Sequence, residues 1–510
     1  MKTLRLILGD QLNHKHSWYR ENSDEVLYFI AEMRQETDYT VHHIQKIVAF
    51  FEAMGQFANW LESHGKQVIY YRLDNRENQQ NLAANIKQLI KRFAIQKFEY
   101  QLPDEYRLDK QLKILTRELE IECCAYDTEH FFTSREALSN FFRGKKTLLM
   151  ENFYRHMRKK HDILMSQQDK PEGGKWNYDQ SNRNKWKGDL VVPGQCRFRK
   201  EVGHTLARIR QAGVKTIGDI NPEGFSWPGD RKDSLKMLQH FCKHLLPHFG
   251  DFQDAMDPEE TCLFHSRLSF SLNCKLLSPR EVIDAAIHRW RKSQRTISIS
   301  QVEGFIRQIL GWREYMRGIY WREMPGYSHC NVLQNRNRLP KWYWTADTEM
   351  NCLYHTIKNS LEHSYAHHIQ RLMITGNFAL LIQTHPDQID AWYLGIYIDA
   401  VQWVEMPNTR GMSQFADGGM IATKPYVSSG AYINKMSNYC GDCKYNVNKK
   451  TGEGACPFNY LYWNFLMEKY DYFKGNPRMA MALNMLDKKP KKERQGIHRQ
   501  ANAFIRSMSQ

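Results

Sequence analysis

The first 130 residues alternate short apolar runs with segments whose apolar residues recur every three or four positions. The apolar runs predict strands at 4–8, 26–30, 67–73, 98–100 and 120–126, and the periodic segments predict helices such as 41–64 and 78–93. Strands that alternate with helices are typical of a parallel sheet covered on both faces. We therefore predict an α/β, Rossmann-like domain at 1–130.

The pattern changes twice further along the chain. Regularity fades from 131 to 210, where a basic run at 155–160 precedes a turn-rich loop at 171–179, and this stretch predicts an interdomain connector. From 211 to 510 nearly every periodic segment is helical, which predicts a large all-α domain with a basic C-terminal tail at 488–494. The predicted helices cover 232–248, 279–294, 298–322, 349–375, 387–403 and 458–473.

Charge and hydropathy restrict the class of partner. The chain carries 72 Lys and Arg against 56 Asp and Glu, a net charge of +16. This excess favours a polyanion such as nucleic acid, although a merely solubilising surface would have the same composition. No run of eighteen apolar residues occurs, so we expect a cytoplasmic protein that does not enter a membrane.

Four cysteines have the spacing of metal ligands. Cys440 and Cys443 form a Cys-x-x-Cys pair, Cys456 precedes a proline, and Cys352 lies far upstream. Zinc and iron–sulfur clusters both accept four thiolates, and spacing alone does not separate them. Zinc ribbons usually use two close pairs, whereas only one pair is present here, so we favour an iron–sulfur cluster.

Histidines and aromatic residues lie between these cysteines. His363, His367 and His368 are predicted on one helical turn, but no glutamate follows His363 as in the zinc-binding pattern. They are either ordinary helix histidines or proton donors beside a redox cofactor. The aromatic runs at 342–344 and 392–393 are either core or an electron pathway.

Two polar segments in the helical region predict a ligand. Residues 265–272 combine hydroxyls and an arginine at a helix start, which suits a diphosphate, although a capped helix would look the same. Glu303, Arg307 and Gln308 lie where an amphipathic helix should be apolar. Such buried charges need internal salt bridges or a polar ligand.

These segments resemble a known family. The stretches 266–269, 305–314, 371–378 and 392–408 are similar to the FAD-binding domain of the cryptochrome/photolyase family, and 6–12 resembles its antenna domain. The four cysteines narrow the resemblance to the bacterial iron–sulfur branch, the prokaryotic (6-4) photolyases. The resemblance implies light-driven repair of (6-4) pyrimidine–pyrimidone photoproducts in DNA. Excited reduced FAD would donate an electron to a flipped-out lesion.

The resemblance also assigns roles to individual residues. His368 is the implied proton donor, supported by His367, and Tyr426 and Tyr432 line the lesion pocket. Asp179 lies near the lesion or a divalent ion such as Mg²⁺. Adjacent His367 and His368 depart from the animal enzymes, whose two histidines stand a turn apart, so a tyrosine would fill part of the second role.

The remaining implied roles concern cofactors. Cys352, Cys440, Cys443 and Cys456 would hold a 4Fe–4S cluster, and Trp392 with Trp344 or Tyr393 would carry electrons to the flavin. Asp10, Gln11, Glu36 and Tyr39 would contact a 6,7-dimethyl-8-ribityllumazine antenna. The residues expected to bind FAD are Ser266, Ser269, Glu303, Arg307, Gln308, Arg371, Asp399, Glu405 and Asn408.

Three alternatives remain open at this point. A cryptochrome-type photoreceptor would have the same fold and flavin but a signalling output. A light-independent iron–sulfur DNA-binding protein would lack flavin absorption, and a zinc-stabilised helical scaffold would lack iron. For the repair enzyme we expect a monomer whose partner is ultraviolet-damaged DNA.

Overall fold

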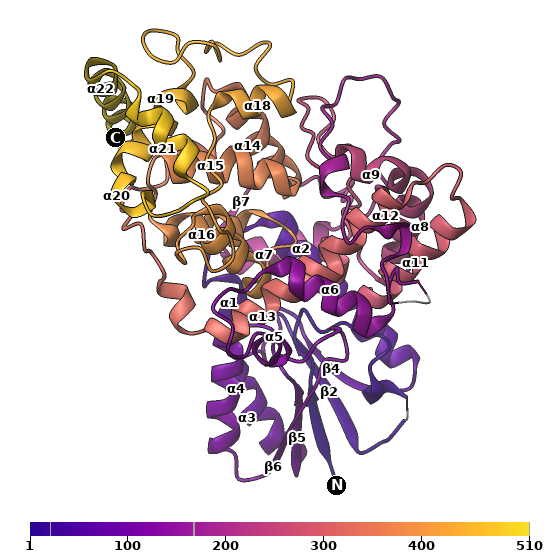
Figure 1. The fold of residues 1–510 in the computed structure, drawn as a ribbon. Helices are drawn as coiled ribbons and strands as arrows, with labels where there is room; N and C mark the ends of the chain where they lie inside the picture. The colour runs from indigo at the N-terminus through magenta and orange to yellow at the C-terminus, as the bar shows by residue number, and fades with distance from the viewer. Residues whose placement is uncertain (21, 167–168, 509–510) are drawn as a thin grey trace.

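A computed structural model of the chain describes residues 1–20, 22–166 and 169–508. An α/β domain is built from the N-terminal residues, and a larger helical region extends from it (Figure 1). The α/β domain contains a sheet of five parallel strands. These strands are β1 (Thr3–Leu6), β2 (Val26–Ala31), β4 (Gln67–Tyr71), β5 (Lys97–Gln101) and β6 (Glu122–Tyr126).

The strand order creates a ligand-binding edge. The order is β4-β2-β1-β5-β6, so the chain builds outward from β1 on one side and then returns to build β5 and β6 on the other. Where the order reverses, the loops after β1 and β5 diverge and leave a crevice at the carboxyl ends of the strands. The predicted Rossmann-like domain is therefore confirmed, with strand ends that differ from the prediction by at most two residues.

Helices cover both faces of this sheet because successive strand residues point to opposite sides. α2 (Ile44–Ser63) packs on the face that presents Tyr28 and Ile30. α3 (Leu82–Phe93) and α4 (Tyr106–Glu118) pack on the face that presents Leu4 and Phe29. Two minor elements complete the domain, α1 (Arg34–Thr37) and the two-residue strand β3 (His42–His43), which pairs with β7 (Thr216–Ile217).

The connector is partly helical. α5 (Ala137–Phe141) and α6 (Met150–His161) share an apolar cluster with the first helices of the helical region. α7 (Gly203–Gln211) packs instead against α2 of the α/β domain. The segment between α6 and α7 has only two short 3₁₀ turns, at 172–174 and 179–181.

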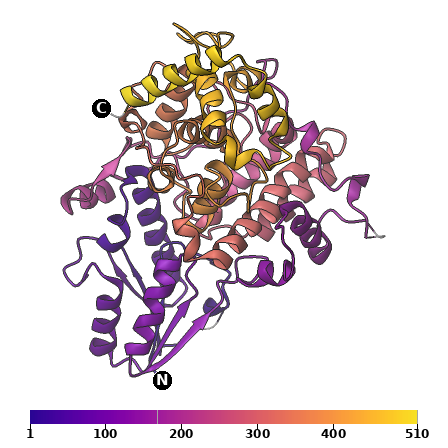
Figure 2. The ribbon, with the colours of Figure 1, turned by 60° about the vertical axis from the view of Figure 1, so that its left-hand side comes forward.

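The predicted all-α architecture of the C-terminal region is also confirmed (Figure 2). Its first half contains α8 (Arg231–His240), α9 (Leu246–Phe252), α10 (Ser269–Asn273), α11 (Pro279–Lys292), α12 (Ile299–Ile306) and α13 (Glu314–Glu323). Its second half contains α14 (Asn351–His363), α15 (Asn377–Leu381), α16 (Pro386–Ile396), α17 (Gln402–Met406), α18 (Gly430–Met436), α19 (Pro457–Glu468), α20 (Tyr470–Phe473), α21 (Ala480–Asp487) and α22 (Lys491–Ser507).

Three of the predicted helices are broken, one of them at Lys469, which separates α19 from α20. The segment 349–375 was expected as one helix, but α14 ends at His363 because Ser364 adopts a left-handed conformation with φ of 53°. The segment 387–403 is likewise divided between α16 and α17. Four π-helical turns occur in the described chain: η4 (Phe241–Leu245), η5 (Arg307–Arg313), η8 (Gln370–Gly376) and η9 (Pro407–Ser413).

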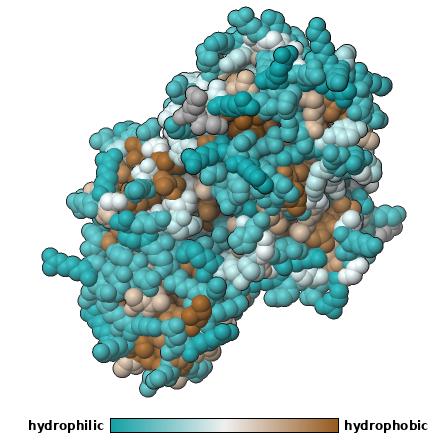
Figure 3. Space-filling model, turned by 90° about the vertical axis from the view of Figure 1, so that its left-hand side faces the viewer, coloured by the Kyte–Doolittle hydropathy of each residue, from teal (hydrophilic) through white to brown (hydrophobic). Residues whose placement is uncertain are grey.

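An apolar cluster joins the two parts of the molecule. It combines Ile7 and Ile44 of the α/β domain with Phe270, Tyr365 and Ile398 of the helical region. The face shown in Figure 3 is mostly hydrophilic, with apolar residues confined to scattered patches. Within the described residues, none of the helices has the length and apolar character that crossing a lipid bilayer requires.

Candidate functional site

Asp399 is the centre of a buried polar group. It follows α16, and both of its carboxylate oxygens have partners. Arg371 Nη2 lies 3.0 Å from Oδ1, and Ser269 Oγ donates to Oδ2 at 2.6 Å. The Arg371 guanidinium also stacks 3.8 Å above the ring of Tyr397. The structure therefore brings together three predicted flavin-site residues that lie up to 130 positions apart in the sequence.

Three further predicted flavin residues also have hydrogen-bond partners. Glu405 in α17 is buried and accepts a hydrogen bond from Thr409 Oγ1 at 2.6 Å. Burial raises the pKa of this carboxyl, and Arg371 opposes the shift. The Asn408 amide donates to the Val404 carbonyl at 2.7 Å, and Ser266 Oγ accepts from the Leu268 amide at 3.4 Å.

Glu303, Arg307 and Gln308 form contacts with the connector and with their own helix. Glu303 accepts from the Tyr154 hydroxyl at 2.9 Å and from the Tyr178 amide at 3.0 Å. Arg307 Nη1 lies 3.0 Å from Asp179 Oδ1, and Gln308 Nε2 donates to the Gly304 carbonyl at 3.2 Å. These charges thus have internal partners that fasten the connector over α12 and η5.

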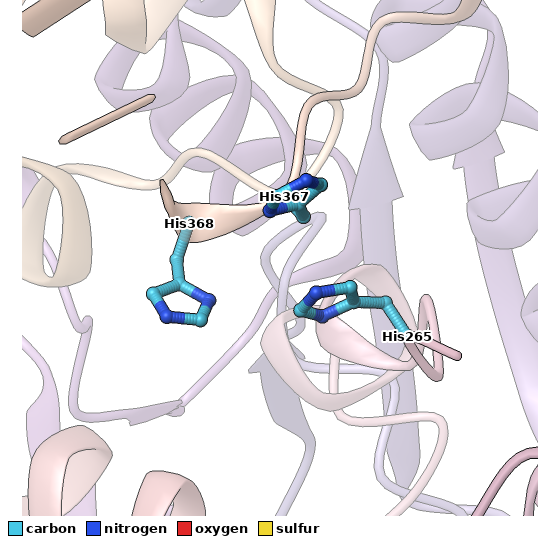
Figure 4. Close-up of side chains that lie close together, drawn as sticks. All are labelled: His265, His367 and His368. Atoms are coloured by element: carbon cyan, nitrogen blue, oxygen red, sulfur yellow. The ribbon is translucent and has the colours of Figure 1, made fainter. Parts of the chain in front are cut away.

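The three predicted histidines do not share a helical turn, which corrects that expectation. α14 ends at His363, and the left-handed Ser364 turns the chain so that 364–367 are not helical. The ring that stacks on His367 is instead His265, at 4.6 Å between centroids and 11° between planes (Figure 4). His368 meets His265 edge-on at 5.7 Å.

The nitrogens of His265, His367 and His368 approach within 4.8 Å of one another, yet the arrangement does not suit a metal ion. Histidine binds a metal through a nitrogen lone pair that lies in the plane of the ring. The His265 and His367 rings are stacked in nearly parallel planes, so their lone pairs do not converge on one ion. Burial lowers the pKa of His265 to about 3 and that of His367 well below its usual value. Both rings are neutral near pH 7 and can accept or relay a proton.

His368 is partly exposed and lies among several polar side chains. Its side chain is 47% exposed, and its Nε2 lies 3.3 Å from Asp254 Oδ1. Burial raises the pKa of the nearby Tyr432 phenol, Asp254 raises it further, and Arg183 lowers it. Tyr426 is exposed beside the same group, and Arg183 pairs with Asp179. The predicted lesion residues therefore lie near one another at the surface.

The aromatic residues form a series of ring contacts. Trp392 is 2% exposed and touches Tyr343 edge-on at 5.0 Å, Tyr393 at 5.3 Å and Tyr397 at 5.8 Å. Tyr343 in turn stacks on Trp342 at 4.8 Å. The predicted Trp344 is 39% exposed, and none of the ring contacts found among the described residues involves it.

The four cysteines surround a small enclosed cavity of about 10 Å³. Cys352 lies in α14, Cys440 and Cys443 follow α18, and Cys456 is the N-cap of α19. Burial raises the pKa of Cys440 to about 11 and of Cys456 to about 12, and nearby thiols raise them further. Thiols held this way favour a cation that would stabilise their thiolates. The donor set therefore fits a thiolate-bound metal centre.

A larger cavity of about 150 Å³ lies at the edge of the sheet where the strand order reverses. Asp10, Glu36 and Tyr39 line it, together with Trp403 of the helical region. The predicted Gln11 lies outside the lining. Its side-chain Oε1 accepts from the backbone amide of Leu8, and its Nε2 donates to the Gln101 carbonyl. The cavity is thus formed jointly by the two domains.

Lys46, on α2, also lines this cavity and was missed by the sequence analysis. It is buried, and its Nζ donates to the Leu394 carbonyl at 2.7 Å. Burial lowers the pKa of Lys46 to about 7, and Glu405, Asp399 and Glu105 oppose the shift. A lysine among apolar helix positions gives no local signal, since only the tertiary fold shows that it is buried.

Comparison with solved structures identifies the fold. The chain superposes on a bacterial class III photolyase from Agrobacterium tumefaciens with a TM-score of 0.61 and 13% identity, covering 99% of this chain and 98% of that one. Superposition on a Synechocystis sp. PCC6803 cryptochrome gives a TM-score of 0.55 and 12% identity, covering 85% of this chain and 88% of that one. The molecule has the photolyase/cryptochrome fold.

Sequence comparison identifies the family. Residues 5–227 match the family model described as deoxyribodipyrimidine photo-lyase-related protein. Over its full length the chain is 39% identical to a protein of Agrobacterium fabrum (strain C58) named (6-4) photolyase, which is also covered completely. The chain belongs to the photolyase family, as the sequence motifs indicated.

Proposed function

We propose that this protein repairs (6-4) pyrimidine–pyrimidone photoproducts in DNA with light. The observation that carries the proposal is the cluster around His368, in which an exposed imidazole, two tyrosines and Asp254 lie together. The full-length relative named (6-4) photolyase supports the same lesion class. The net charge of +16 favours a DNA partner.

FAD fits the residues around Asp399. Arg371, Asp399, Glu405 and Asn408 supply donors and acceptors in a buried setting, and Ser266 and Ser269 supply hydroxyls at the start of α10. When bound and reduced, FAD supplies the light-driven electron. Arg371 and Asp399 would hold the cofactor, and His368 would donate a proton to the lesion from Nδ1, the ring nitrogen that Asp254 does not engage. Asp254 holds that imidazole in position.

An iron–sulfur cluster fits the cysteine site better than zinc does. A single zinc ion with bonds of about 2.3 Å requires sulfurs about 3.8 Å apart. Among the described residues, no three of the four sulfurs gather within 4.8 Å of one another. This spread supports a multi-iron centre such as a 4Fe–4S cluster.

The remaining cofactor assignments follow the same geometry. The cavity at the sheet edge fits a compact antenna chromophore, and Asp10, Glu36 and Tyr39 offer acceptors for a ribityl chain such as that of 6,7-dimethyl-8-ribityllumazine. Trp392, Tyr343 and Trp342 form the ring series through which electrons would reach the flavin, with Tyr393 beside it. Asp179 and Asp254 lie near the lesion residues. Because Asp179 is already paired with Arg183 and Arg307, Asp254 is the less compensated carboxylate and would attract Mg²⁺.

The test compares wild type with His368→Ala on duplex DNA that carries one (6-4) photoproduct. Wild type should restore intact thymines under blue light and not in darkness. The variant should keep its flavin and iron while losing at least about a hundredfold of the repair rate, because general acid catalysis contributes that much or more. Illuminated wild type that binds the lesion but leaves it unrepaired would favour the photoreceptor alternative.

A further inference from the structure

Gln370 is a buried side chain with both ends of its amide engaged. It is 2% exposed and is the third residue of the helical segment that begins at His368. Its Oε1 accepts from the His367 backbone amide at 3.1 Å, which is the contact of a glutamine that caps a helix start. Its Nε2 donates to the Tyr439 hydroxyl at 2.9 Å. Capping accounts for the first contact, whereas the second joins this helix to a residue 69 positions away.

The peptide group between Ala366 and His367 is bound at both ends by side chains. Arg371 Nε donates to the Ala366 carbonyl at 2.7 Å, and Gln370 accepts from the His367 amide on the opposite side of the same group. Both residues of this peptide are buried. Because a peptide group is planar and rigid, these two contacts fix where the chain enters His368. The rings of His367 and His368 leave the chain in different directions from this point (Figure 4).

Tyr439 belongs to the cysteine site. It directly precedes Cys440 and lines the small cavity that the four cysteines surround. Its carbonyl accepts from Asn351 Nδ2 at 2.8 Å, one residue before Cys352 in α14. The Tyr439 ring is buried and stacks on His355 at 5.8 Å between centroids. The position of its hydroxyl is therefore set by the same segments that hold the cysteines.

We propose that Gln370 is a positioning residue for His368, and that it links this histidine to the cysteine site through Tyr439. The role of His368 as proton donor rests on the proposed function. Arg371 pairs with Asp399, so the peptide before His368 is held from the flavin-site group on one side and from the cysteine site on the other. A displacement of about 1 Å can slow a reaction about a hundredfold, so these contacts matter for proton transfer.

The experiment uses the full-length protein with its cofactors and begins with Gln370→Met, which removes both contacts at similar volume. Hydrogen exchange of the peptide 364–369 is measured in darkness, and repair per absorbed photon is measured separately from lesion affinity. The exchange rate of the His367 amide should rise about tenfold, as expected for the loss of one buried hydrogen bond. Repair should fall about 10- to 100-fold, while the dissociation constant for lesion DNA stays at the wild-type value.

Gln370→Glu is the conservative variant. In either protonation state its carboxyl group can accept from the His367 amide, and the Tyr439 hydroxyl can donate to it or accept from it. This variant should therefore recover most of the repair and of the exchange protection that Gln370→Met loses. A role in packing alone would make no such distinction between two side chains of nearly equal size.

Tyr439→Phe tests the link to the cysteine site, because it removes one oxygen and keeps the ring. It should raise exchange in 364–369 and lower repair, with bound iron unchanged. The double variant with Gln370→Met should be no worse than Gln370→Met alone, since both changes interrupt one contact. Tyr460→Phe, at a buried ring of α19 that packs against Phe504, should equal wild type in every measurement.

Two results would overturn the proposal. Wild-type exchange and repair in Gln370→Met would show that Gln370 does not position His368. Impaired Gln370→Met with unaffected Tyr439→Phe would reduce Gln370 to a helix cap and reject the link. If Gln370→Met is insoluble, Tyr439→Phe decides the question. Wild type that repairs no lesion would instead count against the proposed function, and exchange in 364–369 would still test whether Gln370 and Tyr439 hold the segment.

Discussion

At the scale of single residues, the site is defined by polar groups whose burial the local sequence does not reveal. Asp399 and Arg371 could be assigned from the motif resemblance, because each is embedded in a recognisable stretch. His265 lies beside the predicted Ser266, yet its stacking on His367 depends on the left-handed Ser364, which no helical period predicts. Lys46 could not be found, since its helix looks ordinary until Glu105 and Glu405 approach it through the fold.

Lys46 gives a prediction about pH. Its folded-state pKa of about 7 lies below the ordinary value of 10.5, so the unfolded chain binds the proton more tightly between these values. The penalty for burying the ammonium group is therefore fully present below pH 7 and disappears as pH rises toward 10.5. Lys46→Met should raise the free energy of unfolding by up to about 4 kcal/mol at pH 6 and by much less at pH 9.5.

Urea denaturation at these two pH values checks the prediction, with Lys87→Met as the control. Lys87 lies on α3 with a half-exposed side chain paired to Glu118, so its replacement should change stability little and equally at both pH values. If the change in the free energy of unfolding caused by Lys46→Met does not vary with pH, burial of the Lys46 ammonium group is not its cause.

At the scale of elements, the helices of this fold were predictable and their interruptions were not. Three of the four π-helical turns contain predicted flavin-site residues: η5 contains Arg307 and Gln308, η8 contains Arg371, and η9 contains Asn408. A π turn inserts one residue and rotates the following side chains, which is why such turns are frequent at functional sites. Because the chain stays helical through the insertion, the sequence predicts a continuous helix across it.

The four cysteines lie in α14, in the loop after α18 and at the start of α19. Cys443→Ala should remove one ligand and so weaken the attachment of the loop after α18 to α14 and α19. Metal binding by such sites contributes directly to folding. We expect soluble yield and bound iron to fall about tenfold or more, while the matched Cys330→Ala, at a half-buried thiol outside the site, retains both. Iron-free Cys443→Ala that stays soluble and repairs DNA would contradict a structural role for the centre.

At the scale of the whole molecule, the cavity at the sheet edge depends on both domains. The family resemblance implied a ligand contact at Asp10, shortly after β1, and the cavity lies there, where parallel sheets commonly bind ligands. The sequence could not predict that residues 400–403 close the other side, because that contact joins segments almost 400 positions apart. A chromophore held between the domains would lie close to the Asp399 group, and Lys46 faces both sites.

The cavity formed by the two domains gives the final prediction. Ala31, at the end of β2, lines the cavity, and Ala31→Trp would place an indole inside it. The extra volume should cost about 1–3 kcal/mol of stability and exclude the antenna, since the space is only about 150 Å³. The purified variant should lack the non-flavin absorption band but keep FAD, and repair should persist under wavelengths that the flavin absorbs directly.

Ala84→Trp, at an exposed position on α3, should retain both chromophores. If Ala31→Trp binds the second chromophore at the wild-type ratio, the antenna lies elsewhere, and the crevice at the strand reversal would need another ligand.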